Sequence, residues 1–197
     1  MESDRERGAH PRPHTRWLPC ETGATWLDLV ATVRAAYGPA PVERLESPGH
    51  LFEWLSSHGL RPVARPTKVD LIRARGLRES LRGLALATVR GEPRSAKDLA
   101  FLNEVLAEDL PLKLGAGASK RLEMRPPMTP REALARIARE AATHLAGPAA
   151  ATLHTCADAD CGMLFLDPSG RRKWCTTEIC GVRNRVRAHR RRCGADA

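Results

Sequence analysis

Four cysteines in the last quarter of the chain have the types and spacing of a metal site. Cys156 and Cys161 enclose four residues, Cys175 and Cys180 enclose another four, and thirteen residues separate the two pairs. Two close cysteine pairs joined by a short segment are typical of a tetrahedral zinc site with four thiolate ligands. Because four protein ligands close the coordination sphere, we expect one structural Zn²⁺ rather than a catalytic ion.

Other interpretations of the cysteines fit less well. A disulfide framework is disfavoured because no secretory signal is visible and an intracellular chain keeps its thiols reduced. Four unliganded core thiols remain an alternative. His154 and His189 flank the cysteines and could each replace one ligand, but the regular spacing favours the cysteines. The two remaining cysteines, Cys20 and Cys193, are expected to be dispensable for metal.

A strongly basic stretch overlaps the second cysteine pair. Residues 171–192 hold nine Lys or Arg and one acid, Glu178, for a net charge of +8. A zinc ion with four thiolates carries −2, and cations are favoured at a helix C-terminus, so part of this charge has a local explanation. The excess of arginine favours binding to the phosphates of nucleic acid. The candidate contacts are Arg171, Arg172, Lys173, Arg183, Arg185, Arg187, Arg190 and Arg191. A merely solvated or protein-contacting basic face is the alternative.

A hairpin and a helix are expected to position these residues. Residues 163–166 form an apolar run, Asp167-Pro168-Ser169-Gly170 is a turn sequence, and residues 171–174 are expected to return as the second strand. Asp158 and Asp160 are expected to serve turn geometry in the first cysteine pair. A helix capped by Thr176 or Thr177 follows. Its apolar residues recur at helical spacing and are expected to pack on the hairpin: Ile179, Val182, Val186 and Cys193.

The preceding part of the chain predicts a mainly α fold with a short β-hairpin. Successive amphipathic stretches predict a helix from about Trp26 to Gly38, one from Pro48 to Gly59, and a longer one from Thr67 to Gly91. Val69, Ile72, Leu77, Leu81, Leu84 and Val89 are its expected core residues. Further helices should begin at Ser95, with Leu99, Leu102 and Leu106 inward, and at Thr129, with a stop at Gly147-Pro148. Residues 112–114 and 121–124 should pair between them.

Composition and motifs argue against several classes of function. The chain has 197 residues and a net charge of +9, and no apolar stretch approaches the eighteen residues that a membrane span needs. Residues 115–120 lack the glycine before lysine that a phosphate-binding loop requires, and neither G-x-S-x-G nor H-E-x-x-H occurs. We therefore expect a cytoplasmic protein that is not an enzyme.

The cysteine region resembles the CGNR zinc-finger family. The resemblance lies in Asp160-Cys161, Leu164 to Ser169, Arg171 to Cys175, and Cys180-Gly181-Val182-Arg183 leading to His189-Arg190-Arg191. It implies a DNA-binding transcriptional regulator. One position departs from the family, because Val182 replaces the family's asparagine, and this puts in doubt whatever backbone or base contact that asparagine makes.

The preceding part resembles the ABATE domain, in Trp26 to Val30 and from Ser47-Pro48 through Trp54-Leu55 to Gly59-Leu60. This likeness implies an effector or sensing domain. We therefore expect a disordered tail (1–16), a helical ABATE-like domain (17–150) and a four-cysteine finger (151–197). The partners would be DNA and an unknown small-molecule effector, with a homo-oligomer left open. The alternative function is a zinc-stabilised protein-interaction or dimerisation module that does not bind nucleic acid.

Overall fold

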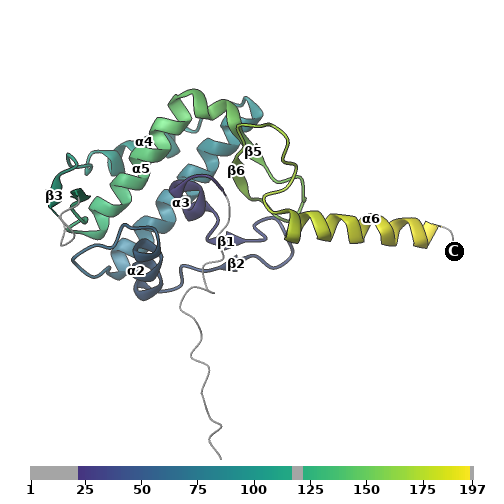
Figure 1. The fold of residues 1–197 in the computed structure, drawn as a ribbon, viewed down its shortest axis with the longest axis horizontal. Coiled ribbons are helices and arrows are strands. Elements are labelled where there is room, and N and C mark those ends of the chain that lie inside the picture. Colours follow the sequence, from purple (N-terminus) through teal and green to yellow (C-terminus); the bar gives the residue numbers. More distant parts are fainter. Residues whose placement is uncertain (1–21, 117–121, 196–197) are drawn as a thin grey trace, which may run out of the picture.

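The computed structural model describes residues 22–116 and 122–195, so Cys20 and the predicted tail lie outside the described residues. A helical body precedes a small C-terminal finger, from which one helix projects (Figure 1). The helices of the body are α1 (Thr25–Val30), α2 (Pro48–Ser57), α3 (Lys68–Arg90), α4 (Ala96–Leu106) and α5 (Pro130–Ala146). The mainly α fold with short strand pairs confirms the predicted fold class.

The long helix α3 lies at the centre of the body. Thr67 and Asp70 form a capping box at its start, and Gly91 ends it in the left-handed conformation (φ 66°). The two internal glycines do not break α3, because they are sites of close approach to α4. A Cβ at Gly76 would lie 3.1 Å from the ring of Phe101, and one at Gly83 would lie 2.6 Å from Asp98 Oδ2.

Helices α1, α4 and α5 pack around α3 and enclose the main hydrophobic core (Figure 1). Its largest fully buried side chains include Trp26, Trp54, Leu81 and Ile137. The predicted starts of the helices hold, since the hydroxyls of Ser47, Ser95 and Thr129 accept backbone N–H bonds from His50, Asp98 and Glu132.

Three details of the helical prediction were wrong. Helix α1 ends at Val30 rather than near Gly38, because the chain turns at Thr32 and enters β1 (Val33–Arg34), which pairs with β2 (Val42–Glu43). Val69 and Ile72, near the start of α3, are 61% and 68% exposed and face solvent. Leu99 of α4 is 42% exposed for a similar reason.

The expected hairpin between α4 and α5 is present. Strand β3 (Leu114–Ala116) pairs with β4 (Leu122–Met124) in antiparallel register, with Leu114 opposite Met124. The pairing is close to the predicted segments 112–114 and 121–124.

The finger also contains a hairpin, but its strands are not the predicted pair. After a 3₁₀ turn (Pro148–Thr152), β5 (Leu153–Thr155) pairs with β6 (Leu164–Leu166), placing Leu153 opposite Leu166. Residues 171–174, the predicted return strand, form no strand. The physical reason is burial: Leu153 and Leu164 are 5% and 1% exposed and belong to the core of the helical body. Strand β5 therefore pairs with β6 in place of residues 171–174.

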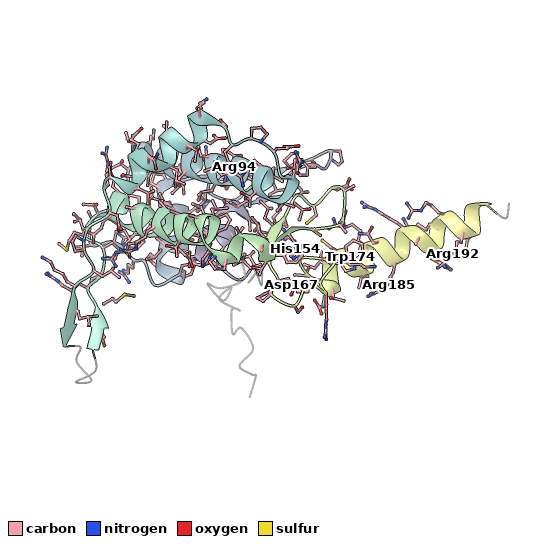
Figure 2. All side chains as sticks on the ribbon, turned by 90° about the horizontal axis from the view of Figure 1, so that it is seen from above. Arg94, His154, Asp167, Trp174, Arg185 and Arg192 are labelled. Atoms are coloured by element: carbon pink, nitrogen blue, oxygen red, sulfur yellow. The ribbon has the colours of Figure 1, made fainter. Side chains whose placement is uncertain are left out.

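The chain after Cys175 is helical, as predicted, but it starts with a π turn (Thr177–Gly181) before α6 (Val182–Ala195). The expected packing of its apolar residues on the hairpin was wrong. Ile179, Val182 and Val186 are 38%, 42% and 43% exposed, and Cys193 is exposed. Helix α6 leaves the body after its first turns and extends away from it (Figures 1 and 2).

Candidate metal centre and nucleic-acid interface

The four predicted cysteines come together at one point. The Sγ atoms of Cys161, Cys175 and Cys180 lie 3.5–3.6 Å from one another, and the four ligand atoms, including that of Cys156, all lie within 4.8 Å. A tetrahedral zinc ion with bonds of about 2.3 Å separates its sulfurs by about 3.8 Å. Disulfide bonds are far shorter, at about 2.05 Å. The geometry therefore fits one structural Zn²⁺ and not a disulfide pair.

The charge state of the cluster also points to a cation. Hydrogen bonding from Cys161 lowers the pKa of the Cys156 thiol to about 2, and the same contact raises the pKa of Cys161. Burial raises the pKa of Cys180 to about 12. Thiols this close and this buried cannot all ionise unless a cation lies among them. A divalent ion held by four thiolates removes that conflict and ties the two halves of the finger together.

The first cysteine pair is shaped by backbone hydrogen bonds. Cys156 N donates to Met163 O at 2.8 Å, and Cys161 N donates to Asp158 O at 2.9 Å. Gly162 follows with φ +66°, a conformation that side chains rarely adopt, and a Cβ there would lie 2.9 Å from the ring of Tyr37. The turn and the approach of Tyr37 together explain the glycine.

The second pair depends on the turn that precedes it. The carboxylate of Asp167 accepts hydrogen bonds from the hydroxyl and backbone N–H of Ser169 and from the N–H of Arg172. These bonds, led by the Ser169 hydroxyl, lower the pKa of Asp167 to about 2. The guanidinium of Arg172 in turn donates to Cys175 O at 2.6 Å and stacks 4.6 Å from the Phe165 ring. The predicted Asp-Pro-Ser-Gly turn is thus present, and Arg172 is engaged inside the finger.

Two acids of the first cysteine pair hold the basic helix. Asp158, whose side chain is 0% exposed, accepts bonds from Arg183 and Arg187, both at 3.1 Å. Arg187 also pairs with Asp160. Asp158 also accepts a hydrogen bond from the backbone N–H of Asp160. It therefore has the predicted role in the turn and a second role, the ion pairs with the arginines of α6. The ion pairs were missed at the sequence level, although an acidic pair facing a +8 segment was a usable signal.

The other candidate cations remain at the surface. Arg171, Lys173, Arg185, Arg190 and Arg191 are exposed, as is Arg192. Among the residues that the structure describes, no carboxylate pairs with the four arginines of this group that lie on α6, or with Arg171 and Lys173. Figure 2 shows Arg185 and Arg192 along the projecting helix. The structure therefore divides the predicted set into side chains that support the finger and side chains that face solvent.

Position 182, where Val replaces the family's asparagine, lies at the first residue of α6 and is 42% exposed. Its neighbour Asn184 donates through Nδ2 to Cys180 O at 3.0 Å and so satisfies a backbone acceptor beside the metal cluster. Val182 has no polar side-chain atom with which to make a comparable bond.

The comparisons with known proteins agree with this architecture. Residues 23–148 match the model of ABATE, described as "Putative stress-induced transcription regulator". The chain belongs to the ABATE family. Residues 152–193 match the CGNR zinc finger. A search of curated proteins finds no match. Among the described residues, no helix is long and apolar enough to cross a membrane.

The ABATE body and the CGNR finger are in direct contact. Arg82 of α3 donates to Gly162 O at 3.1 Å and to Val30 O at 2.8 Å, which links the first cysteine pair to α1. Leu166 N donates to Thr22 O at 2.7 Å. Ala31, at the end of α1, lies in the small apolar cluster that contains the four cysteines. The finger is therefore continuous with the body rather than tethered to it.

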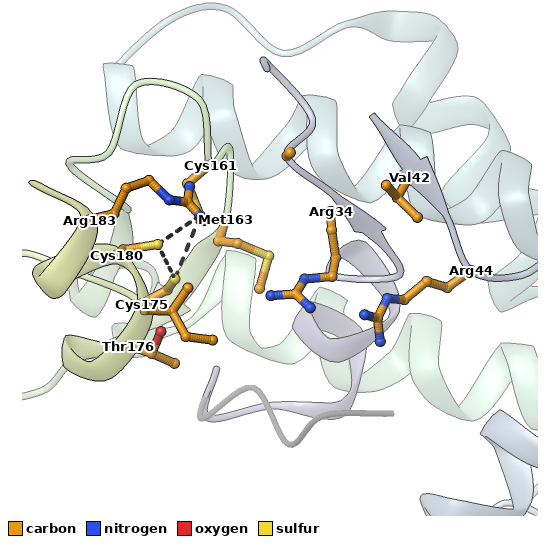
Figure 3. Close-up of a pocket in the computed structure, with 11 residues that line it drawn as sticks. Arg34, Val42, Arg44, Cys161, Met163, Cys175, Thr176, Cys180 and Arg183 are labelled. Carbon is orange, nitrogen blue, oxygen red and sulfur yellow. Dashed lines mark hydrogen bonds between the residues drawn. The ribbon is translucent and has the colours of Figure 1, made fainter. Parts of the chain in front are cut away.

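A cleft of about 280 Å³ lies where the β1–β2 hairpin faces the metal cluster (Figure 3). Arg34 and Val42 of the hairpin line one side, and Met163, Cys180 and Arg183 of the finger line the other. In Figure 3 the Arg34 and Arg44 side chains extend from the hairpin toward the finger. The cleft adds positive charge from the body to the face of the finger that carries Arg183.

Proposed function

We propose that this ABATE-family protein is a DNA-binding transcriptional regulator whose CGNR finger contacts DNA through α6. The observation that carries the proposal is the division of the arginines. Arg183 and Arg187 fix the first turns of α6 to Asp158 and Asp160, while Arg185, Arg190 and Arg191 face solvent on a helix that leaves the body. Exposed arginines without a carboxylate partner, on a projecting helix, supply the phosphate contacts that dominate affinity for DNA.

The dimensions of α6 suit this role. Its fourteen residues span roughly 21 Å at 1.5 Å per residue, and an α-helix fits into the major groove of B-DNA. In this proposal Cys156, Cys161, Cys175 and Cys180 hold the zinc, which supplies structural cross-linking and no chemistry. The buried Asp158 then sets the rotation of α6 about its axis, and Arg171 and Lys173 extend the contact beside the helix.

The test is the salt dependence of binding to a mixed-sequence duplex, measured by fluorescence anisotropy. With about five phosphate contacts, the slope of log affinity against log salt should be about −4 to −5. Arg185→Ala or Arg190→Ala should reduce the magnitude of the slope by about one without changing the melting temperature. The matched control is Arg94→Ala, an exposed arginine on the body away from α6 (Figure 2), which should change neither quantity.

Arg187→Ala separates a supporting side chain from a contacting one. Because it removes ion pairs to both Asp158 and Asp160, it should loosen α6 in the free protein, as measured by faster amide hydrogen exchange in residues 182–190. Arg185→Ala should leave that exchange unchanged. A folded, zinc-loaded protein with no salt-sensitive affinity for any duplex would contradict the proposed function.

A second candidate function rests on a different face of the same helix. Ile179, Val182 and Val186 form an exposed apolar stripe at helical spacing, which suits contact with a protein or a second copy of the chain. Val186→Ser distinguishes the two: loss of a dimer in sedimentation with unchanged DNA affinity would favour the interaction module. Loss of DNA affinity from a monomeric protein would favour the DNA-binding role.

A further inference from the structure

A second groove lies in the ABATE body. Its volume is about 640 Å³, within the range of small-molecule sites. It lies between α5, the residues that follow α2, and strand β4. None of its lining residues belongs to the finger, and the proposed DNA contacts do not use it.

The groove carries more positive than negative charge. Arg61 and Arg125 line it, are exposed, and have no carboxylate partner among the residues that the structure describes. The Arg61 guanidinium lies 5.2 Å from the Phe52 ring centre, which orients it without neutralising it. Two further lining arginines are balanced internally, Arg136 by Glu132 and Arg139 by Asp109. Two guanidinium groups therefore remain for an anion.

One acid, Glu140, lines the groove and offsets part of this positive charge. Glu140 accepts the backbone N–H groups of Thr25 and Trp26 with its two oxygens, at 3.3 and 3.0 Å. Both of its oxygens are therefore occupied by backbone N–H groups at the start of α1. The lining still carries a net positive charge, because Arg61 and Arg125 outnumber this single carboxylate.

A histidine adds a directional donor. Trp26 Nε1 carries a hydrogen and donates it to His144 Nδ1 at 3.0 Å. A neutral His144 must then carry its own hydrogen on Nε2, where the described residues offer no acceptor. His144 lines the groove, so Nε2 is a third donor that an anionic or carbonyl oxygen could satisfy.

Apolar side chains form the rest of the wall. Leu112 and Met124 are 46% and 61% exposed and line the groove together with Leu60 and Ile137. Large apolar side chains left exposed beside such cations suit a ligand with both an apolar body and an acidic head. A free inorganic anion would leave these side chains in water.

We propose that this groove binds an amphipathic organic anion, with its carboxylate or comparable acidic group at Arg61, Arg125 and His144 and its apolar body against Leu112 and Met124. Charge-assisted bonds from a guanidinium are the strong type of hydrogen bond, which is why the acidic head determines selectivity. This proposal concerns the ABATE body alone and does not depend on whether α6 binds DNA.

The experiment uses the full-length zinc protein and ¹H–¹⁵N NMR titration with two matched probes, 1-naphthoate and the neutral 1-naphthamide. Decanoate serves as a third probe, to separate an aromatic from an aliphatic body. We expect saturable shifts at Leu60, Thr143 and His144, with naphthoate or decanoate binding at least about tenfold more tightly than the amide. Inorganic phosphate alone should produce no saturable shift, because it lacks an apolar body.

Variants then assign the head group. Arg61→Ala and Arg125→Ala should each weaken binding by about tenfold, Arg61→Lys should recover part of the loss, and Arg94→Ala should have no effect. Because Arg61 and Arg125 are exposed, these variants should keep the wild-type melting temperature. Equal affinity for acid and amide, shifts confined to residues outside the groove, or displacement of the probe by duplex DNA at this site would each overturn the proposal.

Discussion

The ABATE body and the CGNR finger bury side chains on different scales. In the body, two tryptophans and many leucines are fully excluded from water around α3. In the finger, the separate apolar cluster consists of the four cysteines, Met163, Phe165 and the partly buried Trp174, and Ala31 from the end of α1 packs into it. A cluster of this size cannot offset the conformational entropy of about forty residues by burial alone, so the metal has to supply the difference.

The boundary between these two modes of stabilisation does not follow the family boundary. Leu153 and Leu164 lie inside the segment matched by the CGNR finger, yet their side chains belong to the core of the body. The hairpin β5–β6 is therefore supported by hydrophobic packing, whereas α6 is supported by the metal cluster and by the ion pairs of Asp158. One part of the finger, β5–β6, thus depends on packing against the body, and the other part, α6, depends on the metal.

Removal of zinc should give the largest effect and tests this division most directly. Structural zinc typically contributes about 10–16 kcal/mol of apparent binding free energy. We expect stoichiometric zinc in protein purified without chelator. Cys175→Ser should then lose the metal and the ordered α6 while the body and β5–β6 stay folded, as measured by elemental analysis and hydrogen exchange. Cys193→Ser is the control and should retain both. Unfolding of the body together with α6 would show that the two regions are not separable.

Leu164→Ala should destabilise the body although it lies in the finger's sequence. Truncating a buried leucine costs about 2–5 kcal/mol, and Leu164 is 1% exposed. Chemical denaturation followed by tryptophan fluorescence should report the loss, because Trp26 and Trp54 lie in the same core. Val182→Ala, an exposed change in the same finger, should stay within about 0.5 kcal/mol. If the body of the Leu164→Ala protein keeps its stability, Leu164 does not contribute to the core of the body. The body and the finger would then be separate units with the boundary that the family matches give.

Gly162→Ala should have a smaller effect on stability. It tests the close contact between Gly162 of the finger and Tyr37 of the body. A second glycine, Gly170, has nearly the same φ (+63° against +66°), but a Cβ there meets nothing within 4 Å. Gly170→Ala should cost about 1 kcal/mol of backbone strain, whereas Gly162→Ala should cost about 1–3 kcal/mol more because Tyr37 and Ala36 crowd it. Thermal unfolding measures both. Adding Tyr37→Ala to the Gly162 variant should recover part of the loss, and equal costs for the two glycines would contradict the crowding.

The smallest expected effect is the acid sensitivity of the Asp167 turn. Its folded pKa, about 2, lies below the ordinary value of 3.8. The carboxylate therefore stabilises the finger fully above about pH 4, and this contribution is lost as the pH falls through the folded pKa near 2. Asp167→Asn should lower stability at neutral pH and flatten the stability profile between about pH 4 and 2, as measured by denaturation at several pH values. Parallel profiles for the two proteins would contradict the role of Asp167.

Local patterns in the sequence were sufficient for the starts of α2, α4 and α5 and for the metal residues, and insufficient for the end of α1 and for packing between distant segments. Ser47, Ser95 and Thr129 are caps because their hydroxyls act within three residues, which the sequence displays directly. The spacing of the cysteines is similarly local. The partner of β6 depended on which strand could also bury Leu153 against α3, and the exposure of Val182 depended on the direction in which α6 leaves the body. Neither is encoded in a short window.

The sharing of Leu153 and Leu164 between body and finger has a consequence for the order of synthesis. The ribosome makes the body first, and the two leucines that complete its core are added only after α5 has been made. Until then α3 presents an uncovered apolar surface, which is the kind of surface that promotes aggregation of nascent chains. A body truncated at residue 148 is therefore a poor starting point for expression, whereas a fragment that extends through β6 carries the complete core.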